Sequence, residues 1–393
     1  MRLSYSDAGG LSLSFSRSHA AGRNADVTGE RRAIAPTTPG AASRSSALPA
    51  DRSADITVLR TIAGLLSQMR SGQAAGLSLD KIGVRNALIE LDYDGRQSRW
   101  GIPSGDISVK HLDERSVVSG LATIAEAEGR NMVFALHAES STATRDILLR
   151  TSMRGVQPAM IGRMAPAFAS LSRLSAPVSA EARFKLRETG DVVSGAVTME
   201  IGSGSAAIAD QLEPIRLDHG RLALEFGGQA TSIAIAPSTV SWGGGNELML
   251  AGTIDRSETT GQWQFALDAR RGHFVDQPGG SVRQPIERWS VAGAVDPGSG
   301  HLRLDKAVIA VAGGSLVVQG QVEGGAASRY NLKGRIGPAP LSALAYLWPS
   351  GVAPVAHAWV RENVVGGRVD GGRFALGAGN AAPSQSLVLH ARD

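Results

Sequence analysis

Between residues 212 and 336, apolar and polar residues alternate in short runs that are separated by glycine. Successive side chains of a β-strand point to opposite faces, so this alternation predicts strands with one apolar and one polar face. Turn residues follow each run, which lets neighbouring strands pair as antiparallel hairpins. The clearest runs are 215–226, 232–235, 247–252 and 262–267. We therefore predict one long meander whose apolar face has to be covered.

The same alternation recurs on both sides of this region. Asp94-Gly95, between two such runs, is typical of a tight hairpin turn. The order aliphatic, any residue, Leu, Asp, basic occurs at 77–81, 215–219 and 302–306, which either chance or a repeated β-unit explains. Further strands are predicted at 11–15, 77–82, 87–93, 98–102, 105–111, 116–127, 132–138, 147–154, 178–187, 192–201, 367–375 and 386–390.

Helices are predicted only at a few places along the chain. Apolar residues spaced three and four apart predict helices over 51–70 and 158–174, the second kinked or split at Pro166. Residues 18–50 contain few aliphatic side chains, so they cannot offset the entropy of ordering and are expected to be disordered. Two shorter helices are predicted at 340–348 and 353–363. The resulting units are a largely disordered segment (1–50), a first β-unit with flanking helices (51–174), the central β-meander (175–336), and a helical spacer that starts a further β-unit (337–393).

Composition excludes several classes of protein. The net charge of +4, from 40 basic and 36 acidic residues, comes without a dense basic patch among aromatics, so no nucleic-acid partner is expected. The 48 glycines have no three-residue period, which excludes collagen, and the absence of cysteine excludes disulfides and thiolate metal sites. Aromatic residues make up only 5% of the chain, which favours an open sheet over a core closed by large side chains.

The candidate motifs for catalysis and cofactor binding lack the structural context that their chemistry requires. Residues 202–207 match G-x-G-x-x-A, but Pro214 leaves little room for the helix that would hold a pyrophosphate. Ser78 and Lys81 have the S-x-x-K spacing, yet in a strand they point to opposite faces. We predict no cofactor, no metal and no enzymatic activity, although a catalytic group assembled by the fold stays open. The eight histidines stand singly: His19, His111, His137, His219, His273, His301, His357 and His390.

The C-terminal part of the chain resembles a known family. The order Leu347-Trp348-Pro349, then 353–363 with Trp359-Val360, then Gly366-Gly367-Arg368-Val369 is similar to a segment of the AsmA-like proteins, particularly the YhdP type, which are related to TamB. In that family a W-P, a helix with W-[VIL] and a glycine introduce the next β-unit. Residues 174–184, 190–192 and 199–204 also look like it, and the likeness covers about 150–390.

The resemblance implies an envelope protein of a Gram-negative bacterium, anchored in the inner membrane, with a curled β-sheet that crosses the periplasm. Family members are thought to carry phospholipid acyl chains along the groove of that sheet. This chain has no run of about 18 apolar residues and no signal peptide at its N-terminus. It is also shorter than the family's usual members, so we expect it to be a truncated chain or a middle piece whose anchor is missing.

We therefore predict a mainly β protein: an elongated, antiparallel, curled sheet of repeating β-units that forms a groove, with a few packed helices. Its expected partners are phospholipid acyl chains, and inner and outer membrane surfaces or envelope proteins. The alternatives are a scaffold for outer-membrane assembly, with a filled interior, and an envelope hydrolase. Rows such as Val240 with Trp242 are typical of either a core or a groove. The residues predicted to line the groove are Leu222, Leu224, Phe226, Ile233, Ile235, Leu248, Leu250, Trp263, Phe265 and Leu267.

Overall fold

The computed structural model describes most of the chain from residue 81 onward and a short hairpin before it. The described residues are 2–6, 10–14, 81–93, 96–112, 115–125, 131–141, 143–164, 171–207, 214–228, 231–257, 259–275, 279–296, 299–323, 329–347, 362, 366–378 and 384–392.

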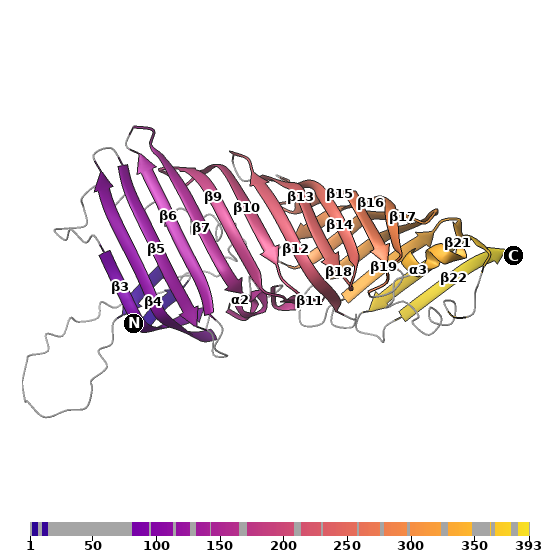
Figure 1. Ribbon diagram of the computed structural model, residues 1–393, viewed down its shortest axis with the longest axis horizontal. Helices are drawn as coiled ribbons and strands as arrows, with labels where there is room; N and C mark the ends of the chain where they lie inside the picture. Colours follow the sequence, from indigo (N-terminus) through magenta and orange to yellow (C-terminus); the bar gives the residue numbers. More distant parts are fainter. Residues whose placement is uncertain are drawn as a thin grey trace, which may run out of the picture.

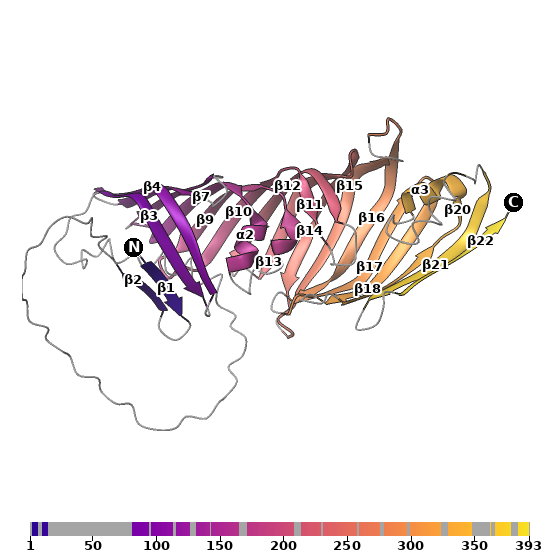
Figure 2. The same ribbon diagram turned by 90° about the horizontal axis from the view of Figure 1, so that it is seen from below.

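Twenty of the described strands, β3 to β22, form one antiparallel sheet that twists and curls along the long axis of the molecule (Figures 1 and 2). The long strands follow one another in sequence order, and β3 and β22 are the two edges, at opposite ends of the molecule (Figure 1). A separate hairpin joins β1 (Arg2–Ser6) and β2 (Gly10–Ser14). The prediction of a mainly β, elongated and curled antiparallel sheet with few helices is confirmed.

The long strands mostly span ten or more residues. The short strands β8, β11 and β20 add to the sheet beside longer neighbours. The strands are β3 (Lys81–Tyr93), β4 (Arg96–Leu112), β5 (Arg115–Ala125), β6 (Asn131–Ser141), β7 (Asp146–Val156), β8 (Leu174–Ser175), β9 (Val178–Arg187), β10 (Val192–Ile201), β11 (Gly204–Ala206), β12 (Ile215–Phe226), β13 (Ser232–Trp242), β14 (Asn246–Arg256), β15 (Trp263–Val275), β16 (Arg283–Asp296), β17 (His301–Val311), β18 (Gly314–Glu323), β19 (Arg329–Ile336), β20 (Ala339–Pro340), β21 (Arg368–Ala378) and β22 (Ser384–Arg392).

The register of the strands places apolar residues opposite apolar residues from one strand to the next. Residues directly opposite each other share a face of the sheet, so the register defines the faces. One row runs Phe226, Ile233, Ile254, Phe265 across β12 to β15. The same face continues through Leu304 of β17, which follows Gly293 in this row. We call this side the apolar face and the other side the polar face.

Glycine recurs on the apolar face and lets neighbouring strands and rings approach closely. A Cβ on Gly293 would lie 2.8 Å from Cζ of Phe265, and one on Gly195 would lie 2.6 Å from Cε1 of Phe184. Because side chains crowd on the inner side of a curled sheet, glycine at these positions permits the curl. The apolar-face glycines are Gly105, Gly120, Gly195, Gly220, Gly252, Gly272, Gly293, Gly314, Gly320, Gly334 and Gly372.

Two short helical segments pack on the apolar face, well separated along the long axis (Figure 2). The first is α2 (Pro158–Met164), whose Met160 joins Met132 and Val156 in a buried cluster, the α2 cluster. The second is a 3-10 turn, η3 (Leu341–Ala343), that runs into α3 (Leu344–Leu347). Ala343 of η3 and Leu344 and Leu347 of α3 belong to a larger buried cluster, which we call the α3 cluster. It consists of Val311, Leu316, Tyr330, Ile336, Ala339, Ala343, Leu344, Leu347, Val369, Phe374 and Leu376.

Several predicted boundaries differ from the structure. The two strands predicted at 98–102 and 105–111 are one strand, β4, in which Pro103 lies at a register shift, where its missing N–H is tolerated. Of the helical stretch predicted over 158–174, the structure shows α2 (Pro158–Met164) and a 3-10 turn at 171–173, while 165–170 lie outside the described residues. Only the last residue differs, because Leu174 pairs with Ala206 of β11 and starts strand β8. Strand β1 was not predicted.

Some of the other predictions are confirmed, and some concern residues outside the described part of the chain. Tyr93 pairs with Arg96, which confirms a hairpin at the Asp94-Gly95 turn, although 94 and 95 themselves lie outside the described residues. Strands β9 and β10 begin and end where the alternation predicts. The helix predicted over 51–70, the strand start at 77–80 and nearly all of the helix over 353–363 also lie outside the described residues. The division of the chain into units stays a prediction.

Candidate functional site

The structure brings all ten predicted groove residues together on the apolar face of β12 to β15. The pairs run across the strands: Leu224 lies opposite Ile235, and Val240 lies opposite Leu248. Phe265 and Leu267 continue the face onto β15. We call these ten residues the central stretch: Leu222, Leu224, Phe226, Ile233, Ile235, Leu248, Leu250, Trp263, Phe265 and Leu267.

The central stretch is only partly covered by protein. Eight of its ten residues are half-buried, while Ile235 and Leu248 are buried, with 6% and 3% of their surface exposed. On the polar face of the same strand β15, Gln264 and Ala266 are exposed. A sealed interior would bury large apolar side chains almost completely, so the half-buried state distinguishes an apolar surface from a filled core.

The covered parts of the apolar face lie on either side of the central stretch. Among the described residues, the buried members of every apolar cluster lie either before residue 187 or after residue 310. These clusters are the α2 cluster, the α3 cluster and a β5–β9 cluster, which consists of Val118, Ala138, Ile147, Leu149 and Leu186. The apolar face is therefore packed at both ends and open in its middle.

Aromatic rings lie at the borders of the central stretch. Phe184 and Phe226 have ring centroids 5.7 Å apart in a tilted arrangement that spans the glycine at position 195. Trp242 meets Phe274 edge to face at 5.9 Å. Trp242 shares the face of Val240, as their phase in the sequence predicts. These rings present flat apolar surface next to the aliphatic rows.

A bulge in β13 keeps the apolar residues of this strand on one face. The register shifts between Ile235 and Ser238, so the residues of β13 on the apolar face have odd numbers before the bulge and even numbers after it. The fully buried hydroxyl of Ser238 stabilises the bulge: it accepts a hydrogen bond from the amide of Ala223 (2.9 Å) and donates one to the carbonyl of Ala236 (2.7 Å). Sequence reasoning missed this bulge, although the phase change between Ile235 and Val240 was its signal.

Residues beyond the ten belong to the same surface. Ile254 lies between Ile233 and Phe265 in the first row, and Val197 lies opposite Leu224 on β10. Both are half-buried. Each follows the alternation of its own strand, so their phase relative to Leu250 or Met199 could have identified them.

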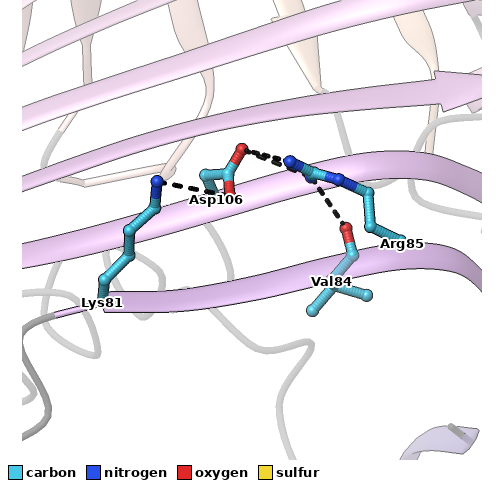
Figure 3. A network of polar contacts seen from close by, with 4 residues as sticks. All are labelled: Lys81, Val84, Arg85 and Asp106. Carbon is cyan, nitrogen blue, oxygen red and sulfur yellow. Dashed lines mark hydrogen bonds and ion pairs between the residues drawn. The ribbon is translucent and has the colours of Figure 1, made fainter.

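The polar face carries charged side chains that pair across the strands. In Figure 3 the carboxylate of Asp106 accepts hydrogen bonds from the guanidinium of Arg85, at 3.2 and 3.3 Å, and the ammonium of Lys81 lies 3.9 Å away. Arg85 also donates to the carbonyl of Val84. Such exposed pairs typically contribute 0 to about 1 kcal/mol each, so they mark the solvated side rather than hold the fold together.

One polar cluster on this face bears on the enzyme alternative. Ser241 is buried, and its hydroxyl lies 3.3 Å from Nε2 of His219 and 3.5 Å from a carboxylate oxygen of Glu247. In a nucleophile relay the carboxylate orients the histidine, whereas here Glu247 contacts the serine itself. Sequence reasoning could not find this cluster, because three strands bring its members together.

Within the described ranges, no group of three or more histidine, cysteine, aspartate or glutamate side chains is placed to hold a metal ion. None of the helices among the described residues is both long and apolar enough to cross a membrane.

Comparisons with family models, with curated proteins and with solved structures found no match for this chain.

Proposed function

We propose that the central stretch binds the acyl chains of phospholipids and that the protein carries lipids along its apolar face without chemical catalysis. The observation that supports this most is the half-buried state of eight of the ten central residues on a face that is packed at both ends. A soluble monomer normally avoids a contiguous apolar surface of this kind, so the surface calls for a ligand.

The energy of acyl-chain burial is sufficient for such binding. Each buried methylene contributes about 0.8 kcal/mol, so a chain of about 15 methylenes gives roughly 12 kcal/mol when fully buried. On a face that covers it from one side, about half of that is expected, on the order of 6 kcal/mol per chain before the cost of association. The rows of aliphatic side chains offer no polar group that would fix a chain in one position, which favours sliding.

The resemblance to the AsmA-like proteins supports a setting for this activity. In our proposal the protein acts between the inner and outer membranes of a Gram-negative envelope, as part of a periplasmic bridge anchored in the inner membrane. The elongated sheet, with its edges at opposite ends, has the shape that such a bridge requires (Figure 1).

Lipid extraction from matched variants tests the proposal. Leu267→Glu places a charge on the apolar face, while Ala266→Glu places the same charge on the exposed polar face one residue away. We expect phospholipid to co-purify with the wild-type chain and with Ala266→Glu, and to be depleted at least fivefold in Leu267→Glu. Equal lipid content in both variants, or none in the wild-type chain, would favour the scaffold alternative instead.

A further inference from the structure

A second site lies on the polar face, away from the central stretch, over strands β6, β7, β9, β10 and β12. Two neighbouring cavities open there, of about 610 Å³ and 210 Å³, and both are lined by Glu181 and Arg183. The larger cavity is also lined by Arg154, Arg221 and Glu200. A volume of this size suits a small molecule.

The strand register forces basic side chains together in the smaller cavity. His137 of β6 lies directly opposite Arg150 of β7, and Arg150 lies directly opposite Arg183 of β9. Like charges in directly opposite positions destabilise a sheet, because their Cβ atoms are only about 5 Å apart. We call these three residues the basic row. An anion bound between Arg150 and Arg183 would relieve this repulsion.

Among the described residues, the arginines of the two cavities form no close ion pair with a carboxylate, although Glu200 lies directly opposite Arg221 in the register. Elsewhere on the polar face carboxylates pair with basic groups, as between Lys185 and Asp146 at 2.9 Å. Of the described residues, none places a carboxylate within 4 Å of the guanidinium of Arg150, Arg154, Arg183 or Arg221. These groups are exposed and free to bind an anion.

We propose that the basic row binds a phosphoryl group, with the remainder of a small phosphorylated ligand in the 610 Å³ cavity. Two guanidinium groups on adjacent strands can each donate a pair of hydrogen bonds to one phosphate, which carries enough charge and oxygen atoms for both. Ser119 lies 3.1 Å from Nδ1 of His137, so the other ring nitrogen, Nε2, can face the anion. Glu181 and Glu200 accept hydrogen bonds from hydroxyl or ammonium groups on the rest of the ligand.

This inference goes beyond acyl-chain binding and does not depend on it, because the two sites lie on opposite faces of the sheet. A phospholipid headgroup and a free phosphorylated compound share the chemistry that the basic row recognises.

The test uses the full chain and glycerol phosphate, titrated by calorimetry at low salt. Removing both guanidinium groups in the double variant Arg150→Gln/Arg183→Gln should weaken binding at least tenfold, since each charge-assisted pair of hydrogen bonds is lost. The matched control is Arg335→Gln/Arg373→Gln, which removes another directly opposed arginine pair of the polar face that lines neither cavity. The control should bind glycerol phosphate within twofold of the wild-type chain.

The possible outcomes distinguish a lipid headgroup from a free phosphorylated compound, and they include results that overturn the proposal. If the Arg150→Gln/Arg183→Gln variant loses binding to phosphatidylglycerol vesicles as well as to glycerol phosphate, the ligand is a lipid headgroup. Vesicle binding that is unchanged in that variant assigns a free phosphorylated compound. Equal weakening in the two double variants, or no binding of glycerol phosphate by the wild-type chain, overturns the proposal. If the glutamine variant fails to fold, Arg150→Lys/Arg183→Lys keeps the charge, loses the paired hydrogen bonds, and should still weaken binding severalfold.

Discussion

Truncating leucines to alanine along one face of the sheet should reveal where that face is packed and where it is open. Leu149 and Leu186 lie in the β5–β9 cluster, with 1% and 0% of their surface exposed. Leu224 and Leu267 lie on the same face in the central stretch and are half-buried. All four are strand leucines, so the substitution is chemically identical and only the cover differs.

The expected costs follow from burial. Leu→Ala at a fully buried site typically destabilises by about 2–5 kcal/mol, because transfer energy is lost and a cavity remains. At a half-buried site solvent already reaches the side chain, so no closed cavity forms. Roughly half of the 1.5–3 kcal/mol of a full burial is then lost, about 1 kcal/mol. Each buried leucine should therefore cost at least twice as much as each leucine of the central stretch.

The assay is urea unfolding of delipidated protein, followed by circular dichroism in the β-sheet band. We expect the midpoint to fall clearly for Leu149→Ala and Leu186→Ala and only slightly for Leu224→Ala and Leu267→Ala. Addition of phospholipid should raise the midpoint of the wild-type chain, since a ligand that binds only the folded state stabilises it. Equal losses at all four positions would refute the reasoning, because they would mean that the central stretch is packed like the ends.

Two further substitutions probe the curl and the bulge. Gly195→Ala should destabilise the fold by about 1–3 kcal/mol, because its Cβ would push the ring of Phe184 aside, whereas Gly227→Ala, with no atom within 4 Å of its Cβ, should not destabilise it; equal urea midpoints would contradict this. Ser238→Ala should cost about 1 kcal/mol, because the part-buried amide of Ala223 loses its hydrogen-bond acceptor, and an unchanged midpoint would show that the hydroxyl does not hold the bulge.

Much of the sheet could be predicted from alternation alone, because a strand with one apolar face has apolar residues at every second position of its sequence. Strands β9 and β10 and the common face of Leu222, Leu224 and Phe226 follow from that period. Irregularities were harder. Pro103 resembles a strand break in sequence, and only the pairing of β4 with both neighbours shows that the strand continues through it.

The open state of the central stretch and the contents of the polar face could not be predicted in the same way. Whether a half-apolar strand is covered depends on where the helices pack, and α2 and α3 pack on other parts of the sheet. The basic row depends on register: Arg150 and Arg183 lie on either side of α2 in the sequence, and only the pairing of β7 with β9 brings them together. A shift by one residue would place them on opposite faces.

Photo-crosslinking on β15 tests the central claim most directly. A photoreactive residue at Phe265 points to the apolar face, and one at Gln264 points to the exposed polar face. When the purified chain is irradiated with phospholipid vesicles, the account predicts lipid adducts at position 265 and almost none at position 264. Equal labelling at the two positions, or labelling at neither, would contradict it.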